Sequence, residues 1–138
     1  MAYEVDCLGG IGMIGYLQNE NLKKLENRLP YKFYDKIIHS VDFIVSAVEA
    51  SEQIYLFGSC ARCEAKWDSD IDLAVISKFP ISDHYLRGYV IDTLDEESEL
   101  GVRADVIFRT YDMVDISKTF KEVFEQDKIL LWERRKQC

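Results

Sequence analysis

Two acidic residues in a predicted strand are the residues best placed to do chemistry. Asp70 and Asp72 flank Ile71 in the stretch Asp-Ile-Asp-Leu-Ala-Val. Because side chains alternate along a strand, both carboxylates share one face, about 7 Å apart, and repel each other. A divalent cation such as Mg²⁺ would relieve that repulsion, since hard cations prefer carboxylate oxygens and phosphates. For this pair alone, a solvated acidic strand edge remains the alternative.

A third carboxylate strengthens the case for a metal site. Asp105 lies in the otherwise apolar stretch 102–108, where burial without a partner would be costly. If this strand lies beside the strand at 71–76, three carboxylates converge. Two cations about 4 Å apart could then activate an attacking oxygen and stabilise a leaving pyrophosphate. The alternative is an ion pair between Asp105 and Arg103 or Arg62.

A predicted strand and turn precede the acidic pair. Residues 53–57 are β-branched and aromatic, which favours a buried strand. Gly58 then permits a tight turn and close approach of a ligand to the backbone. Ser59 is a good N-cap for a short helix through Ala65, and free N–H groups at a helix start can receive phosphate oxygens. Such a turn is common, so it predicts phosphate binding only together with the carboxylates that follow.

The segment Gly58–Asp72 resembles the signature of the DNA polymerase β-like nucleotidyltransferase superfamily, specifically its minimal nucleotidyltransferases. Their pattern is Gly-Ser, ten residues, then Asp-x-Asp, and ten residues separate Ser59 from Asp70 here. The fuller pattern, Gly-Ser-x-Ala-Arg-Gly and Ser-Asp-Ile-Asp-Leu, is matched except at Cys63, where the family usually has glycine. Arg62 stands at a family position, so the resemblance implies a nucleotide-binding residue there, either structural or facing phosphate.

The resemblance implies a fold and a reaction. The fold would be α/β, with a small mixed sheet flanked by helices. Gly58 and Ser59 would hold the β- and γ-phosphates of ATP, and Asp70 and Asp72 would bind two Mg²⁺ ions. Asp105 would complete the shell of the catalytic ion and help to deprotonate the acceptor hydroxyl. The reaction would be in-line transfer of a nucleoside monophosphate, with pyrophosphate leaving.

The resemblance also implies a partner. A stand-alone minimal form is similar to the antitoxin half of two-gene modules, whose other half is a helical HEPN-type ribonuclease toxin. Such an enzyme transfers AMP from ATP to a tyrosine hydroxyl of the toxin. Larger members of the superfamily carry extra domains for which this chain has little room. Two alternatives stay open: a binding module that covers its partner without chemistry, and an enzyme with a small-molecule acceptor.

Composition excludes several other classes of protein. The 138 residues suffice for one domain, and 48% hydrophobic with 30% charged residues is an ordinary globular mixture. Seventeen basic against 25 acidic residues give a net charge of −8, which argues against general nucleic-acid binding. No apolar run approaches the roughly 18 residues of a membrane span. The acidic start argues against a secretory signal, so we expect a cytoplasmic protein with reduced cysteines.

The hydrophobic pattern predicts a single domain with an N-terminal helical segment at 1–50, and the resemblance implies a catalytic core at 53–108. Lys32 and Lys36 fall on the predicted solvent side of the second helix. These N-terminal helices would pack on the sheet or against a second copy of the chain. The predicted elements are helices at 17–29 and 31–50, a strand at 53–57, a short helix at 59–65, a strand at 71–76, a helix at 83–100 closed by Gly101, a strand at 103–108, a helix at 119–126 and a short strand or helix at 129–132.

Two further motifs lack the context that their chemistry needs. Gly10 to Gly15 fit G-x-G-x-x-G, but residues 1–8 make a poor buried strand and no second strand with an acidic residue follows. We therefore expect a flexible or turn-forming N-terminus. Cys60-x-x-Cys63 resembles a redox pair or half of a zinc site. No second cysteine pair exists, and both histidines are distant in sequence.

Overall fold

The computed structural model describes residues 2–6, 13–113 and 116–135. Within these ranges, strands and helices alternate along most of the chain. In order, they are β1 (Ala2–Asp6), β2 (Met13–Gln18), α1 (Asn19–Arg28), α2 (Tyr31–Ala47), β3 (Ser51–Phe57), α3 (Gly58–Ala61), β4 (Ile71–Ser77), α4 (His84–Asp95), β5 (Ala104–Thr110), α5 (Lys118–Asp127) and β6 (Ile129–Arg134). None of the described helices has the length and apolar character needed to cross a membrane.

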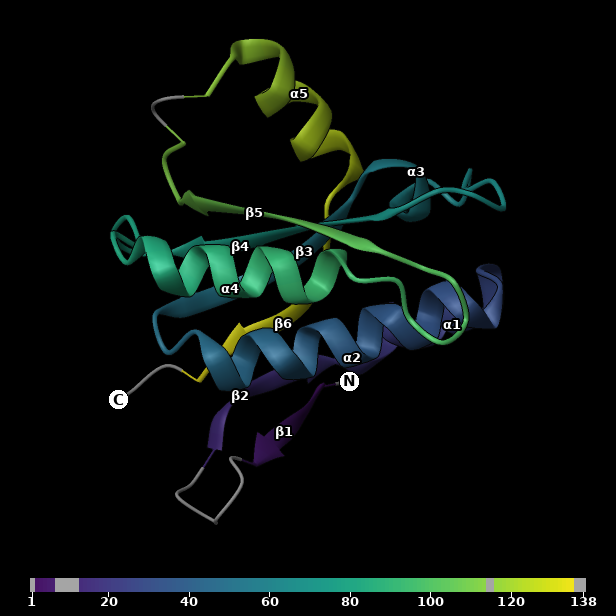
Figure 1. The fold of residues 1–138 in the computed structure, drawn as a ribbon, viewed down its shortest axis with the longest axis horizontal. Coiled ribbons are helices and arrows are strands. Elements are labelled where there is room, and N and C mark those ends of the chain that lie inside the picture. The colour runs from purple at the N-terminus through teal and green to yellow at the C-terminus, as the bar shows by residue number, and fades with distance from the viewer. Residues whose placement is uncertain (1, 7–12, 114–115, 136–138) are drawn as a thin grey trace.

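The described strands form one mixed sheet in the order β1-β2-β6-β3-β4-β5 (Figure 1). β4 and β5 are parallel, and the other neighbouring strands are antiparallel. α4 provides the crossover between the two parallel strands, as a parallel pair requires. The mixed sheet flanked by helices confirms the predicted fold class.

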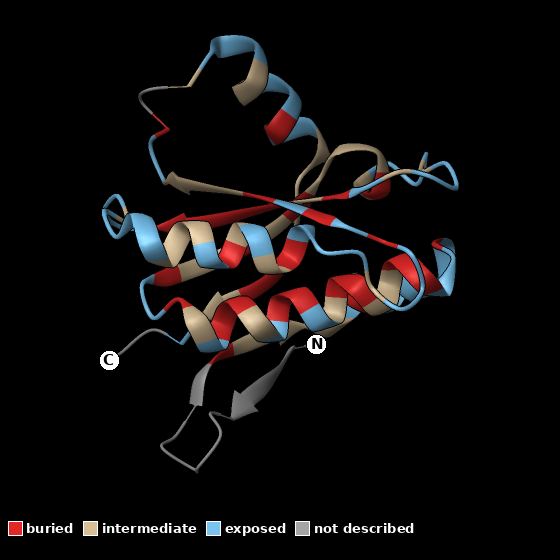
Figure 2. Ribbon diagram, in the orientation of Figure 1, coloured by how far each residue is buried: buried red, intermediate tan, exposed pale blue. Residues whose placement is uncertain are grey.

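Helices cover both faces of this sheet. α2 and α4 lie on one side and α5 on the other (Figure 1). α2 buries Phe33, Ile37, Val41 and Ile44, spaced by three or four residues, on one helix stripe. Figure 2 shows that buried residues follow β4 and the inward sides of α2 and α4. Each large side chain of this core contributes about 1.5–3 kcal/mol of hydrophobic stabilisation.

The opposite face carries a smaller aromatic cluster under α5. Phe57 of β3 packs edge-on against Phe120 and Phe124, with ring centroids 5.8 and 5.6 Å apart. Tyr55 contacts Phe124 in the same way at 5.7 Å. Ser117 caps α5, because its side chain accepts a hydrogen bond from the Phe120 N–H at 3.2 Å. α5 is thereby fixed over β3.

The predicted flexible or turn-forming N-terminus is wrong for β1 and β2, which form an antiparallel pair. β2 also pairs with β6, placing Gly15 opposite Arg134. β1 is an edge strand of the described sheet. Gly15 belongs to this sheet, whereas Gly10 and Gly12 of the glycine motif lie outside the described residues.

Several predicted boundaries also change. α4 ends at Asp95, and Gly101, with φ of +83°, lies in a separate turn, where its N–H donates to the Ser98 carbonyl at 2.8 Å. α2 ends at Ala47, and the segment from Ile129 is a strand. The helix prediction at 83–100 was too long because the acidic segment after Asp95 lacks an apolar stripe.

Gly15 gives a test of the N-terminal pairing. A Cβ at this position would overlap the indole ring of Trp132, so Gly15→Ala should lower the free energy of unfolding by about 1–3 kcal/mol. Gly88, inside α4, has no atom within 4 Å of the place that a Cβ would occupy. Gly88→Ala is the matched control and should raise stability by about 0.5–1 kcal/mol. Urea unfolding measures both, and an unaffected Gly15→Ala would contradict the packing of β2 on β6.

Candidate active site

The three predicted carboxylates come together at one end of the parallel strand pair. Asp72 of β4 and Asp105 of β5 are register partners, and neighbouring strands lie about 4.8 Å apart. Asp70 directly precedes β4. Asp72 is half-buried, whereas Asp70 and Asp105 are exposed. The strand alternation and the parallel register therefore place three acidic groups in one neighbourhood.

The pKa of Asp72 reflects its burial and the two carboxylates near it. Burial raises the pKa of Asp72 from 3.8 to about 6, and the negative charges of Asp105 and Asp70 act in the same direction. The positive charge of Arg62 opposes the shift. The folded chain thus holds Asp72 in a position where its ionised form is disfavoured, and a bound cation would reverse that penalty.

The predicted alternative, an ion pair of Asp105 with a neighbouring arginine, is wrong. Arg103 contacts Glu97 at 3.7 Å and donates to the Asp95 carbonyl at 3.2 Å. Arg62 donates to Glu64 and to Asp127 instead. Because Asp105 is exposed at the open end of the sheet, water can hydrate it and no buried partner is needed.

Gly58 brings the start of α3 against Asp72. Its φ is +77°, and a Cβ there would overlap the Asp72 carboxylate. The left-handed backbone conformation therefore favours glycine here, and a larger residue would also push the Asp72 carboxylate aside. The predicted N-cap role of Ser59 is wrong, because the helix begins at Gly58 with Phe57 as the capping residue. Ser59 lies in the first turn of the helix, beside the acidic cluster.

Arg62 ties this turn to the helix on the same face. Its Nη1 donates to Asp127 Oδ2 at 2.5 Å, and its Nε donates to Glu64 Oε1 at 2.7 Å. Asp127 is the last residue of α5. This contact supports the structural role that the sequence left open for Arg62, and its part in nucleotide binding stays a prediction.

Cys63, the one departure from the family pattern, has φ of +57°. The Glu64 N–H donates to the Ser59 carbonyl at 2.9 Å, and the Cys63 N–H donates to the Cys60 carbonyl at 3.2 Å. These two hydrogen bonds define a Schellman motif, which ends a helix with a left-handed residue, usually glycine. The left-handed backbone at this position explains why the family usually has glycine there. Cys63 adopts the same conformation at an energetic cost.

The cysteine pair does not have the properties of a redox motif. Cys60 is buried, and burial, with the charge of nearby Asp72, raises the pKa of its thiol to about 12. A reactive thiol needs a lowered pKa instead. The Cys60 Sγ lies 3.7 Å from the Asp70 carbonyl and donates to it. Its role is to pack α3 against the segment that leads into β4.

The donor set at the acidic cluster fits Mg²⁺. In the part of the chain that the structure describes, no three acidic, cysteine or histidine side chains form a ready-made metal cage. Mg²⁺ does not require one, since it keeps several waters and takes one or two carboxylates together with substrate phosphates. The repulsion at Asp72 favours cation binding at this place.

Sequence reasoning missed Lys32, which it placed with Lys36 on the solvent side of α2. Both are buried, with exposed fractions of 9% and 7%. The Lys32 Nζ donates to the Trp67 carbonyl at 2.5 Å and lies 3.5 Å from the indole centroid. Lys36 donates to the Glu96 carbonyl at 3.0 Å. Lys32 thereby fixes the turn that leads into Asp70, and a contact across 35 residues leaves no local sequence signal.

The fold and this site define a class of protein. The family described as Polymerase beta, Nucleotidyltransferase matches residues 35–137. This chain therefore belongs to the polymerase β-type nucleotidyltransferase family, and its enzyme class is that of a nucleotidyltransferase. No curated protein is similar enough to the chain to match it.

Solved structures share the fold at low sequence identity. A toxin–antitoxin complex with AMP-PNP is 23% identical, with a TM-score of 0.51 over 72% of this chain and 72% of that one. A variant of the MntA–HpeT toxin–antitoxin complex is 24% identical, with a TM-score of 0.50 over 72% and 71%. A tri-AMPylated Shewanella oneidensis HEPN toxin in complex with an MNT antitoxin is 20% identical, with a TM-score of 0.44 over 85% and 73%.

Replacement of Cys63 tests the strain in the α3 turn. Cys63→Gly should raise the free energy of unfolding by about 1 kcal/mol, because a left-handed conformation costs a residue with a Cβ roughly 1–2 kcal/mol. Cys63→Ala is the matched control: it removes the thiol but keeps the Cβ, so it should not stabilise the chain. Urea unfolding of the reduced proteins measures both. Equal stability of the glycine and alanine variants would contradict this account.

The raised pKa of Asp72 predicts a pH-dependent stability. The folded chain binds this proton more tightly than the unfolded chain, so the contribution of Asp72 to stability falls as pH rises from about 4 to 6. In EDTA at about pH 8, Asp72→Asn should therefore stabilise the chain by about 1–2 kcal/mol, after allowance for solvent screening. The gain should vanish near pH 4.

Thermal unfolding across this pH range checks the prediction. Asp68→Asn is the matched control, because Asp68 is an exposed carboxylate of the same loop, and its effect should stay within about 0.5 kcal/mol. A pH-independent effect of Asp72→Asn would show that the carboxylates do not repel one another as described.

Proposed function

We propose that this chain is a Mg²⁺-dependent nucleotidyltransferase that transfers AMP from ATP to a hydroxyl group, the acceptor being a tyrosine of a cognate HEPN-type toxin. The observation that carries the proposal is the register pairing of Asp72 with Asp105 beside the Gly58 turn. Two carboxylates on adjacent parallel strands, next to a backbone turn open to phosphate, suit a metal-chelated triphosphate. Family membership supports the reaction class.

Each group of the site has a part in the proposed transfer. Asp70 and Asp72 would hold Mg²⁺, with Asp105 completing its shell, and the metal would supply positive charge against the triphosphate and the leaving pyrophosphate. The backbone at Gly58 and Ser59 orients the β- and γ-phosphates. Asp105 accepts the proton of the acceptor hydroxyl. The hydroxyl oxygen then bonds to the α-phosphorus as the bond to pyrophosphate breaks, and positioning supplies much of the rate.

A protein acceptor in the cytoplasm is supported by charge and by the thiols. The net charge of −8 disfavours a nucleic-acid acceptor and suits a basic protein surface. Cys60 and Cys63 are free thiols, as is usual for proteins of a reducing compartment. The resemblance to minimal nucleotidyltransferases supports the HEPN-type toxin as the partner.

Transfer of label from α-labelled ATP tests this function. With Mg²⁺ and host extract, the wild-type chain should label one protein band, and mass spectrometry should place AMP on a tyrosine. Asp72→Asn and Asp105→Asn should each lower the labelling rate by about 100-fold or more, because each removes a charge from the reacting centre. Asp68→Asn, at an exposed loop position, should keep wild-type activity.

The other outcomes separate the alternatives. Label in a small molecule or in RNA would keep the chemistry and overturn the protein acceptor. Absence of label with all four nucleotides, together with a copurifying protein that Asp72→Asn still neutralises, would favour a binding module without chemistry.

A further inference from the structure

A cavity of about 190 Å³ lies at the far end of the two strands that carry the carboxylates. Ser77 and Thr110, the last residues of β4 and β5, contribute to its wall. Asp105 and Arg109 are four residues apart on β5, hence on the same face of the strand and about 13 Å apart along it. The cavity is therefore separate from the acidic cluster.

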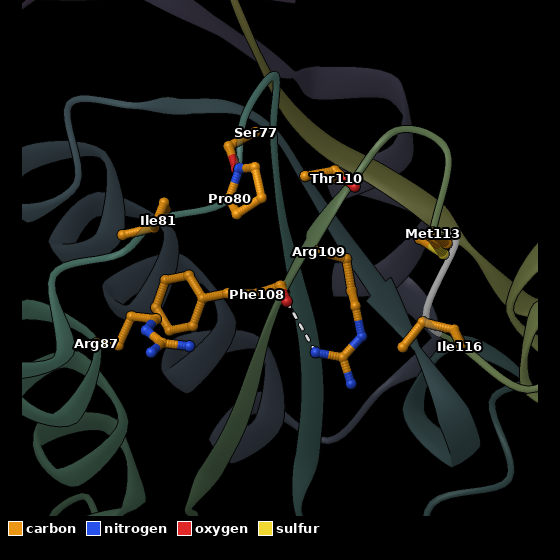
Figure 3. A pocket seen from close by; sticks show the side chains of 9 residues that line it. All are labelled: Ser77, Pro80, Ile81, Arg87, Phe108, Arg109, Thr110, Met113 and Ile116. Atoms are coloured by element: carbon orange, nitrogen blue, oxygen red, sulfur yellow. Dashed lines mark hydrogen bonds between the residues drawn. The ribbon is translucent and has the colours of Figure 1, made fainter.

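Two arginines line this cavity from different elements, α4 and β5 (Figure 3). Arg109 Nη1 donates to the Phe108 carbonyl at 2.8 Å, which turns the guanidinium back along β5. Arg87 Nη2 contacts His84 Nδ1. The Nε atoms of both arginines are buried and have no hydrogen-bond partner among the described residues. Neither arginine has a carboxylate partner within 4 Å in the described part of the chain.

Unpaired arginines are notable in a chain with eight more acidic than basic residues. A buried donor without a partner costs about 1–3 kcal/mol, more when the group is charged. The two Nε atoms are closed off from solvent, so a ligand would meet the other nitrogens of each guanidinium. Two guanidiniums that line one cavity without a carboxylate partner among the described residues indicate a ligand that accepts hydrogen bonds and carries negative charge. The planar guanidinium fork matches the oxygens of a phosphate group.

The apolar part of the cavity wall indicates what kind of molecule bears the negatively charged group. Ile81, Phe108, Met113 and Ile116 line the cavity with apolar surface. An apolar cavity of about 150 Å³ can hold a benzene ring, so this cavity of about 190 Å³ has room for one small ring and not for a whole large ligand. Arg87, Phe108 and Arg109 also line an adjoining open groove, into which the remainder of a ligand can extend.

We propose that this cavity binds a phosphate monoester carried on a small ring-containing body, with Arg87 and Arg109 holding the phosphate and the apolar wall holding the ring. A nucleoside monophosphate such as AMP has this chemistry. The site does not take part in nucleotidyl transfer, and the proposal does not depend on that function, because it concerns binding without Mg²⁺ and without an acceptor.

Calorimetric titration of AMP and of inorganic phosphate into the full chain in EDTA tests the site. AMP should bind at least about tenfold more tightly than phosphate, since burial of a ring adds about 1.4 kcal/mol or more. Arg87→Met and Arg109→Met should each weaken AMP binding by about 10- to 100-fold, the loss expected for a hydrogen bond to a charged group. Equal binding of phosphate and AMP would overturn the assignment of the apolar wall.

Two controls distinguish this site from the catalytic one. Arg103→Met removes an exposed arginine outside the cavity and should leave AMP binding unchanged, as should Asp72→Asn. Loss of AMP binding in Asp72→Asn, with both cavity variants binding normally, would place AMP in the acidic cluster and overturn the proposal. Absence of AMP binding at millimolar concentration would also overturn it, whatever the result of the transfer assay.

Stability measurements guard against misfolded variants. Because neither guanidinium has an ion pair among the described residues, the methionine variants should have a Tm no lower than that of the free wild-type chain. AMP should raise the Tm of the wild type, by linkage of binding to folding, and should not raise that of the variants. Arg87→Lys and Arg109→Lys keep the charge but lose the fork, and they should also bind AMP more weakly.

Discussion

The repulsion between carboxylates on two adjacent parallel strands is the constraint on which the rest of this structure depends. Asp72 and Asp105 are held side by side by the backbone register, and burial makes the ionised form of Asp72 still less favourable. This repulsion weakens the pairing of the two strands. Leu73 and Val75, fully buried on the other face of β4, oppose a change of register, because a slip of one residue would move them out of the large core.

The two faces of the sheet carry hydrophobic clusters of different size, and each has a different structural role. The large core under α2 and α4 supplies the hydrophobic free energy that holds β4 and β5 in register. The smaller cluster under α5 covers β3 and leaves the acidic end of the parallel pair open. Arg62 and Lys32 then fix the connection between α3 and β4 from both sides, through Asp127 and the Trp67 carbonyl. The site proposed for a highly charged nucleotide is thus built on packed secondary structure.

How much of this could be predicted follows from the range of the interactions. Alternation along β4 is local, so the shared face of Asp70 and Asp72 was visible in the sequence. The sequence showed Cys63 only as a departure from the family glycine, and the left-handed conformation there came from the structure. The β1–β2 pairing was not visible, because glycine weakens a strand pattern and the reason for Gly15, its close contact with Trp132, is remote in sequence. The burial of Lys32 was hidden for the same reason, since its partner is remote in sequence.

The two ends of β5 bear opposite charges, and this has a consequence for anions. A chain with a net charge of −8 repels phosphate at long range. Phosphate can therefore bind only where a local cation compensates. In the proposed active site beside Asp105, that cation would have to arrive with the nucleotide, so binding there would depend on metal. In the proposed site beside Arg109, the cation is part of the chain, so binding there would require no metal. On these two proposals, about 13 Å of strand separates a place for metal-chelated phosphate from a place for metal-free phosphate.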